Sequence, residues 1–317
     1  MTLPGPATVP TNSQAGGAAS AGPAGSIYDL GYRRYDGPRL GRRHAVRSLY
    51  AYSLRGTFGI GRSGRAKIAP FLLAFLALLP ALIAVGIAAL VTQAGANSSI
   101  ESPIRYGTYL SFSGTVLILF CAAQAPELVG RDQRYQVLPL YFSRALRRSD
   151  YALAKLCALW TALALVFLTP ETLIFAGRVL ASKDVPAAFF DNIPQVPPIL
   201  AITAVMALTF GGISLALASF TPRRAYATAA IIAAFIVPPI VASIIAQLSN
   251  GPVTVIAALF DPTDLLEGAN SFFFGTHSSN DVLVGSGLPA AAFAAVLLLY
   301  GAATAAITIR RYLRIPA

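Results

Sequence analysis

The sequence predicts an all-helical membrane protein with six transmembrane helices. Of its 317 residues, 56% are hydrophobic and only 12% are charged, whereas soluble domains carry about 25% charged residues. The mean hydropathy of +0.64 agrees. The apolar residues gather in runs long enough to cross a hydrocarbon layer of about 30 Å, so we expect one integrated membrane domain.

The strong positive charge is explained by membrane orientation. A net charge of +11 can indicate nucleic-acid binding, but such proteins place basic residues on a folded polar surface with stacking aromatics. Here the basic residues flank apolar runs. Lys and Arg held on the cytoplasmic side account for this pattern, with attraction to anionic lipid as a secondary effect. We expect a lipid membrane and no nucleic acid as partner.

Two segments precede the first span. Residues 1–26 are rich in Pro, Gly, Ala, Ser and Thr and predict a disordered tail, without the basic and apolar regions of a signal peptide. Residues 27–67 are basic and tyrosine-rich. In a helix, Arg43, Arg47 and Arg55 lie on one side. Another side gathers the apolar residues, which are Val46, Leu49, Tyr50 and Leu54. This segment predicts an amphipathic interfacial helix.

Six apolar runs are each close to the roughly 20 residues that a helical crossing requires. They cover approximately residues 68–91, 107–125, 155–180, 196–219, 225–248 and 288–309. Prolines inside these runs predict kinks, since neighbouring helices can satisfy the freed backbone groups. These prolines are Pro80, Pro170, Pro238 and Pro239.

The distribution of cations predicts the orientation. With a cytoplasmic amino terminus, only Arg105, Arg178 and Lys183 of the 24 Lys and Arg residues lie outside. This is a strong positive-inside signal. We therefore expect both termini in the cytoplasm and the chain in the cytoplasmic membrane.

The predicted outer loop, residues 249–287, holds two apolar pieces, 252–260 and 262–274. Each is too short to cross the bilayer, which favours a pair of short re-entrant or interfacial helices. The alternative is a folded loop that lies on the headgroups.

The inner segment between the second and third spans, residues 126–154, carries a specific pattern. A stretch with Leu and Pro from Leu138 to Phe142 precedes Ser143-Arg144, and Arg148-Ser149-Asp150-Tyr151 then leads to Lys155. This arrangement resembles the permease subunits of type-2 ABC (ABC-2 type) transporters. Ala145 and Ala154 stand where that family often has Pro and Gly.

The resemblance implies a six-span permease of an ATP-driven exporter that works with two separate ABC ATPase subunits and a second permease, identical or related. It implies that the segment from Glu127 to Arg148 docks on the ATPase and transmits its motion. The residues it assigns to coupling are Glu127, Arg131, Asp132, Arg134, Arg144 and Arg148, with Arg223 and Arg224 as a lesser contact. The alternative is an ordinary basic inner loop that only sets topology.

Other chemistry is weakly represented in the sequence. No Gly-Lys-Ser/Thr motif follows a strand, so we expect no enzyme activity or cofactor in this chain, with ATP and Mg bound by the partner ATPase. Ser286 and His277 lack an oxyanion-hole context for hydrolysis. Cys121 and Cys157 lie in or beside apolar runs and predict neither a disulfide nor a metal site.

Glu171 is the one clear acid inside the predicted spans, and Arg178 lies two helical turns later on the same face. This spacing predicts an ion pair or shared water network near the outer leaflet. A residue that lines the export path is the alternative. A single acid does not favour a proton relay, although a secondary transporter or channel without an ATPase stays the alternative function.

Overall fold

The computed structural model describes residues 37, 40–93, 106–143, 146–248, 252–278 and 280–314. From Leu40 onward the chain forms one compact unit. Its described part is helical, and six of its helices are long and apolar enough to cross a membrane. The predicted multi-pass membrane protein is thereby confirmed. The predicted tail, residues 1–26, lies outside the described residues.

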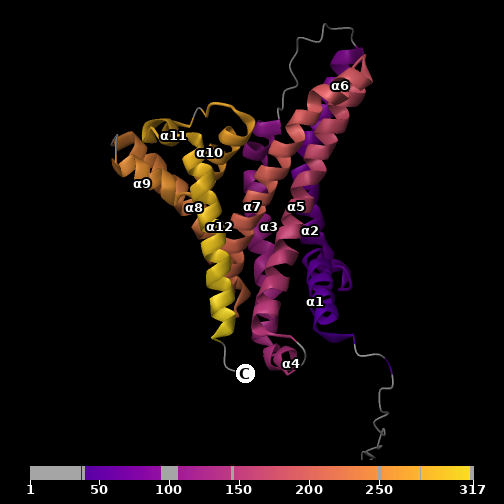
Figure 1. The fold of residues 1–317 in the computed structure, drawn as a ribbon, viewed down its shortest axis with the longest axis vertical. Coiled ribbons are helices and arrows are strands. Elements are labelled where there is room, and N and C mark those ends of the chain that lie inside the picture. The colour runs from indigo at the N-terminus through magenta and orange to yellow at the C-terminus, as the bar shows by residue number, and fades with distance from the viewer. Residues whose placement is uncertain are drawn as a thin grey trace, which may run out of the picture. The chain divides into compact units, whose positions relative to one another are not determined.

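The six long helices are α2 (Gly64–Gln93), α3 (Tyr106–Arg134), α5 (Arg148–Ala181), α7 (Val196–Ser219), α8 (Arg224–Leu248) and α12 (Ala290–Leu313). The shorter elements are α1 (Gly41–Thr57), α4 (Leu138–Phe142), α6 (Val185–Asn192), the 3-10 helix η1 (Ile193–Gln195), α9 (Pro252–Phe260), α10 (Pro262–Phe274) and α11 (Asp281–Ser286). Figure 1 shows α1, α4 and the carboxyl-terminal end of α12 toward one end of this unit, and α6, α10 and α11 toward the other.

The predicted spans coincide with these helices, but several helices extend beyond the predicted bounds. The predicted inner segment 126–154 is largely helical, because α3 continues to Arg134 and α5 begins at Arg148. Pro126 does not end α3. The start of α5 is fixed by a capping contact in which the Asp150 carboxylate accepts the backbone N–H of Arg147 at 3.0 Å. Only residues 135–147 remain between the two helices.

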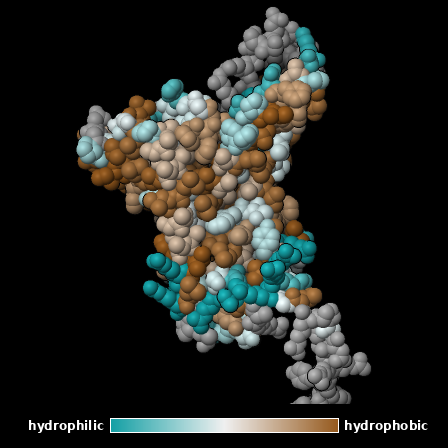
Figure 2. Space-filling view, in the orientation of Figure 1, coloured by the Kyte–Doolittle hydropathy of each residue, from teal (hydrophilic) through white to brown (hydrophobic). Residues whose placement is uncertain are grey.

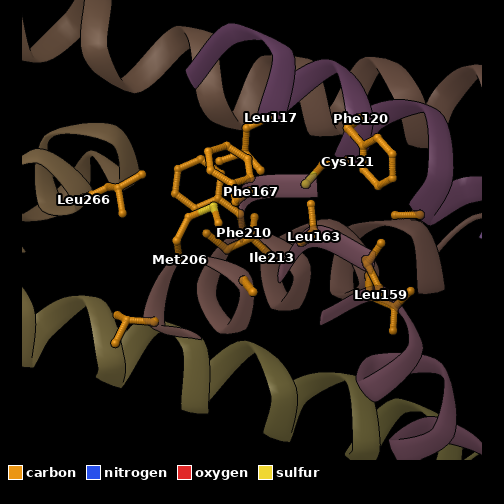
Figure 3. Packing of buried hydrophobic residues seen from close by; sticks show 14 of the residues in the cluster. Leu117, Phe120, Cys121, Leu159, Leu163, Phe167, Met206, Phe210, Ile213 and Leu266 are labelled. Atoms are coloured by element: carbon orange, nitrogen blue, oxygen red, sulfur yellow. The ribbon is translucent and has the colours of Figure 1, made fainter. Parts of the chain in front are cut away.

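The middle of the bundle is formed by α3, α5 and α7. In the apolar window of α7, 78% of the residues are buried, against 17% in α2 and in α8, which expose large hydrophobic side chains. Figure 3 shows how Phe120, Leu163 and Phe210 from the three central helices pack together with their neighbours. The exposed apolar faces of α2 and α8 suit contact with lipid or with another membrane helix.

Small residues bring α7 close to α12. A Cβ added to Gly212 would lie 2.5 Å from Thr304 Oγ1, and one added to Gly301 would lie 2.7 Å from Leu208 Cγ. Both glycines are therefore required by close contact between the two helices.

The two apolar pieces of the outer loop are the helices α9 and α10. Asp261 begins α10 by accepting the backbone N–H of Thr263 at 2.8 Å. Gly275 ends it with a φ of 62°, a left-handed conformation that favours glycine. The re-entrant or interfacial position of these helices stays a prediction, as does the position of α1 on the membrane surface.

Candidate functional site

Basic side chains gather at the end of the bundle that holds α1 and α4, which we call the cationic end. Figure 2 shows hydrophilic surface concentrated there and a more apolar surface beyond it. Contacts between the helix ends confirm the clustering. Arg148 of α5 donates to the Leu313 carbonyl of α12 at 3.1 Å, and Arg311 of α12 lies over the Phe220 ring beside α7 at 5.6 Å.

A buried ion pair joins α3 to α5 close to α4. Lys155 Nζ lies 2.8 Å from Asp132 Oδ2 and donates to the Leu128 carbonyl at 2.9 Å. Tyr151 donates its hydroxyl to the same Asp132 carboxylate at 2.7 Å. The Lys155 side chain is only 3% exposed, so its charge depends on Asp132 for compensation.

Glu127 joins three parts of the chain at the cationic end. Its carboxylate accepts Arg62 from the turn between α1 and α2 at 3.1 Å and Arg224 from the start of α8 at 2.7 Å. The Glu127 side chain is 23% exposed. Glu127 therefore already has two cationic partners within this chain.

Asp150 connects α1 to the first turn of α5. Arg42 Nε and Nη2 donate to the two carboxylate oxygens of Asp150 at 2.7 Å and 2.6 Å, the paired geometry in which arginine holds a carboxylate most specifically. Hydrogen bonding to Asp150 raises the pKa of Arg42. In the sequence, Asp132 precedes the segment that contains α4, and Asp150 and Lys155 follow it, so the two ion pairs involve residues on both sides of that segment.

The other residues assigned to coupling are more accessible. Arg131, Arg134 and Arg223 are exposed, and Arg134 and Arg223 line an open pocket of about 620 Å³ with Arg224. The Arg148 guanidinium lies 5.8 Å from the centre of the Phe142 ring in α4. Arg144 lies outside the described residues. Of the seven predicted residues that the structure describes, two are acids held in ion pairs and five are arginines, of which Arg131, Arg134, Arg223 and Arg224 are exposed.

Residues 135–143, which we call the α4 segment, expose large apolar and aromatic side chains. Leu140 is 68% exposed and Tyr135 is 66% exposed. Leu138 is buried against the bundle instead, and the Phe142 ring meets the Tyr151 ring edge to face at 6.1 Å. The α4 segment is therefore fixed on its inner side and presents Leu140 outward.

Sequence reasoning missed Arg42 and Arg62 as partners. They lie 108 and 65 residues from the acids they bind, and nothing in the local sequence connects them. Lys155 and Tyr151 could have been found, because their spacing of four residues places both on one helix face.

The opposite end holds Glu171 and Arg178. Glu171 is buried, and its Oε2 has no hydrogen-bond partner in the described part of the chain. The Arg178 guanidinium lies over the Tyr106 ring at 4.6 Å. The two side chains remain on one face of α5, and a role for them as an ion pair or in the export path stays a prediction.

The hydroxyl of Ser286, on α11, donates to the Leu283 carbonyl at 2.7 Å.

A second group of acids, not predicted as a site, lies on α10. Asp264 accepts Asn280 Nδ2 at 2.8 Å, and Glu267 accepts the Ser278 hydroxyl at 2.5 Å. Burial, together with the neighbouring charge of Asp261, raises the pKa of Asp264 to about 7, and burial also raises the pKa of Asp261. In the described ranges, no group of three or more His, Cys, Asp or Glu residues is placed to hold a metal ion.

No protein-family model matches this chain, and no curated protein matches it.

Proposed function

We propose that this chain is the permease subunit of an ATP-driven exporter of the type-2 ABC kind, with its cationic end in the cytoplasm. The observation that carries the proposal is α4, a short helix outside the six spans that lies among surface arginines and presents Leu140 to solvent. An apolar side chain surrounded by cations suits insertion into a groove of a soluble partner.

The way in which α4 is held supports a role in transmitting force. Asp132 precedes α4 in the sequence and Lys155 follows it. Their ion pair therefore joins α3 and α5, the two long helices between which α4 lies. The contact between Arg42 and Asp150 adds α1 to the same support. A push on α4 would reach α3 and α5 through the buried Asp132–Lys155 pair, which resists separation, and α1 through the more exposed Arg42–Asp150 contact.

The expected division of labour follows. Two separate ATPase subunits bind ATP and Mg, approach each other, and move α4. Two permeases, identical or related, then rearrange and let the substrate leave along an interface between spans. The exposed apolar faces of α2 and α8 supply surface for that pairing and for lipid.

Association with the ATPase tests the proposal. The candidate partner is a P-loop ATPase encoded beside this chain, produced together with it and purified through a tag on the permease. Leu140→Asp places a charge on the exposed face of α4 and is expected to reduce ATPase recovery by at least about tenfold, since interface anchors dominate binding. The matched control is Val284→Asp, which changes an apolar residue of α11 that is 66% exposed.

Equal recovery of the ATPase with Leu140→Asp and with the control would refute α4 as the docking element. Nucleotide-independent transport by the purified chain alone would instead support the alternative, a secondary transporter or channel. Glu171 would then be the first residue to change, because its buried carboxyl has a free oxygen among the described residues.

The orientation has its own test. Tyr135→Cys, in a variant with Cys121 and Cys157 replaced by Ala, introduces a thiol at an exposed position beside α4. A membrane-impermeant maleimide should label it only after the cells are permeabilised. Labelling in intact cells would place the cationic end outside and contradict the proposal.

A further inference from the structure

A pocket of about 680 Å³ lies between the end of α1, the turn to α2, and the α3–α4 region. Its apolar lining includes Ile60, Leu128 and Val137, and several tyrosines are beside them. Its charged lining residues are Arg55, Arg62, Glu127, Arg131, Asp132 and Lys155. The pocket is therefore amphipathic, and cations outnumber acids in its wall.

The charges within this pocket are not balanced internally. Glu127 is bound by Arg62, and Asp132 is bound by Lys155. Arg55 and Arg131 are exposed and form no ion pair with another described residue. Two guanidinium groups thus remain for a ligand of opposite charge, and guanidinium binds phosphate oxygens with paired hydrogen bonds.

A buried hydroxyl points to the same kind of ligand. Ser53 lines the pocket, is only 2% exposed, and its Oγ has no hydrogen-bond partner in the described part of the chain. A buried hydroxyl without a partner is unfavourable. A phosphate oxygen inside the pocket would accept its hydrogen.

We infer that this pocket binds the phosphate headgroup of an anionic phospholipid from the adjoining leaflet. The location favours a lipid over a soluble anion. The pocket is lined by Ile60 and Arg62 of the turn that leads into α2, whose exposed apolar side chains begin at Ile68, and its wall combines cations with apolar side chains. Arg55, Arg131 and Ser53 hold the phosphate, while Ile60 and Val137 contact the glycerol and the first acyl carbons.

Bound lipid would lie between α1 and the α4 segment, which contact α5 through the Arg42–Asp150 ion pair and the Phe142–Tyr151 rings respectively. The inference does not depend on the proposed export function. It is tested on the permease without an ATPase, so failure of one does not imply failure of the other.

The test measures lipid binding to the purified full chain in a neutral detergent by native mass spectrometry. Phosphatidylglycerol is the probe, with phosphatidylcholine and inorganic phosphate as comparison ligands. We expect one tightly bound phosphatidylglycerol, weaker phosphatidylcholine, and no displacement by inorganic phosphate. The double variant Arg55→Gln/Arg131→Gln should weaken phosphatidylglycerol binding by at least about tenfold, since it removes both charge-assisted contacts.

Two further variants separate a built pocket from general attraction to charge. Arg47→Gln removes an exposed cation from the same helix outside the pocket lining and should leave the affinity unchanged. Ser53→Ala keeps every charge and should weaken binding by about threefold to tenfold, as expected for one hydrogen bond. Its result stands even if the double variant fails to fold.

An equal loss of affinity for Arg47→Gln and for the double variant would overturn the inference, since binding would then be non-specific. Unchanged binding with Ser53→Ala would overturn the pocket as the location. Displacement of the lipid by inorganic phosphate would show a free-phosphate site and overturn the lipid assignment.

Discussion

The two ends of the bundle hold their acidic side chains in different ways. At the cationic end, Glu127, Asp132 and Asp150 are each bound by at least one Arg or Lys at 3.1 Å or less. On α10, Asp261 and Asp264 are held by hydroxyl, amide and backbone donors, and no Lys or Arg among the described residues forms an ion pair with them.

The difference shows what each end requires. The pairs at the cationic end connect helices through charge, because each of these carboxylates has a cationic partner on another part of the chain. A buried carboxyl without a cation keeps its proton more readily, which is why the pKa values of Asp261 and Asp264 are raised. One end is connected by salt bridges, and the other holds buried carboxyl groups whose pKa values are raised.

The largest expected effect comes from Lys155→Ala. This change leaves the partly buried Asp132 carboxylate without its cation and should destabilise the protein by about 3–5 kcal/mol, the typical result of removing one partner of a buried pair. The measurement is thermal unfolding in detergent, with the monodisperse yield from size exclusion. Lys155→Met combined with Asp132→Asn should recover much of the loss, because no unpaired charge remains. A stable Lys155→Ala single variant would contradict the importance of the pair.

Asp264→Asn should have the second largest effect, and at high pH this change should stabilise the protein, whereas Lys155→Ala destabilises it. Because the folded-state pKa of Asp264 is raised from 3.8 to about 7, the protonated group's contribution to stability is full below pH 4 and is lost as pH rises through 7. Asparagine cannot ionise and can keep the bond from Asn280, so the variant should be more stable at pH 8 by about 1–3 kcal/mol.

Unfolding temperatures measured from pH 5 to pH 8 check this prediction. The wild type should lose stability across that range more steeply than the variant, whose remaining slope reports Asp261. The control is Asp281→Asn, which changes an exposed acid on neighbouring α11. Parallel pH profiles of the wild type and Asp264→Asn would mean that the α10 acids do not share the described environment.

Arg42→Gln should have the smallest effect. The Arg42 side chain is 44% exposed, so water and salt screen its paired contact with Asp150, and Asp150 keeps the backbone N–H of Arg147. The expected decrease in unfolding temperature is much smaller than that of Lys155→Ala, and it should shrink further in high salt. An effect as large as that of Lys155→Ala would mean that exposed and buried pairs contribute alike.

Much of the architecture could be predicted from composition and local pattern. The positions of the spans followed from the apolar runs, and the predicted span 196–219 coincides with α7. The ends were less predictable, because α3 continues through Pro126 and α5 begins at a cap that Asp150 makes with Arg147. Such capping and kinking depend on neighbouring helices, which a single apolar window does not contain.

The candidate site, too, could be predicted from the sequence only in part. The six apolar helices of a multi-pass membrane protein could be predicted from the sequence, because hydrophobic length and composition are properties of each segment alone. The packing of the helices was needed to see that Glu127 and Asp132 are bound within the chain, and that Arg55, Arg131 and Ser53 line one pocket. Ion pairs and pockets join residues far apart in sequence, so their partners are fixed by helix packing rather than by any local pattern.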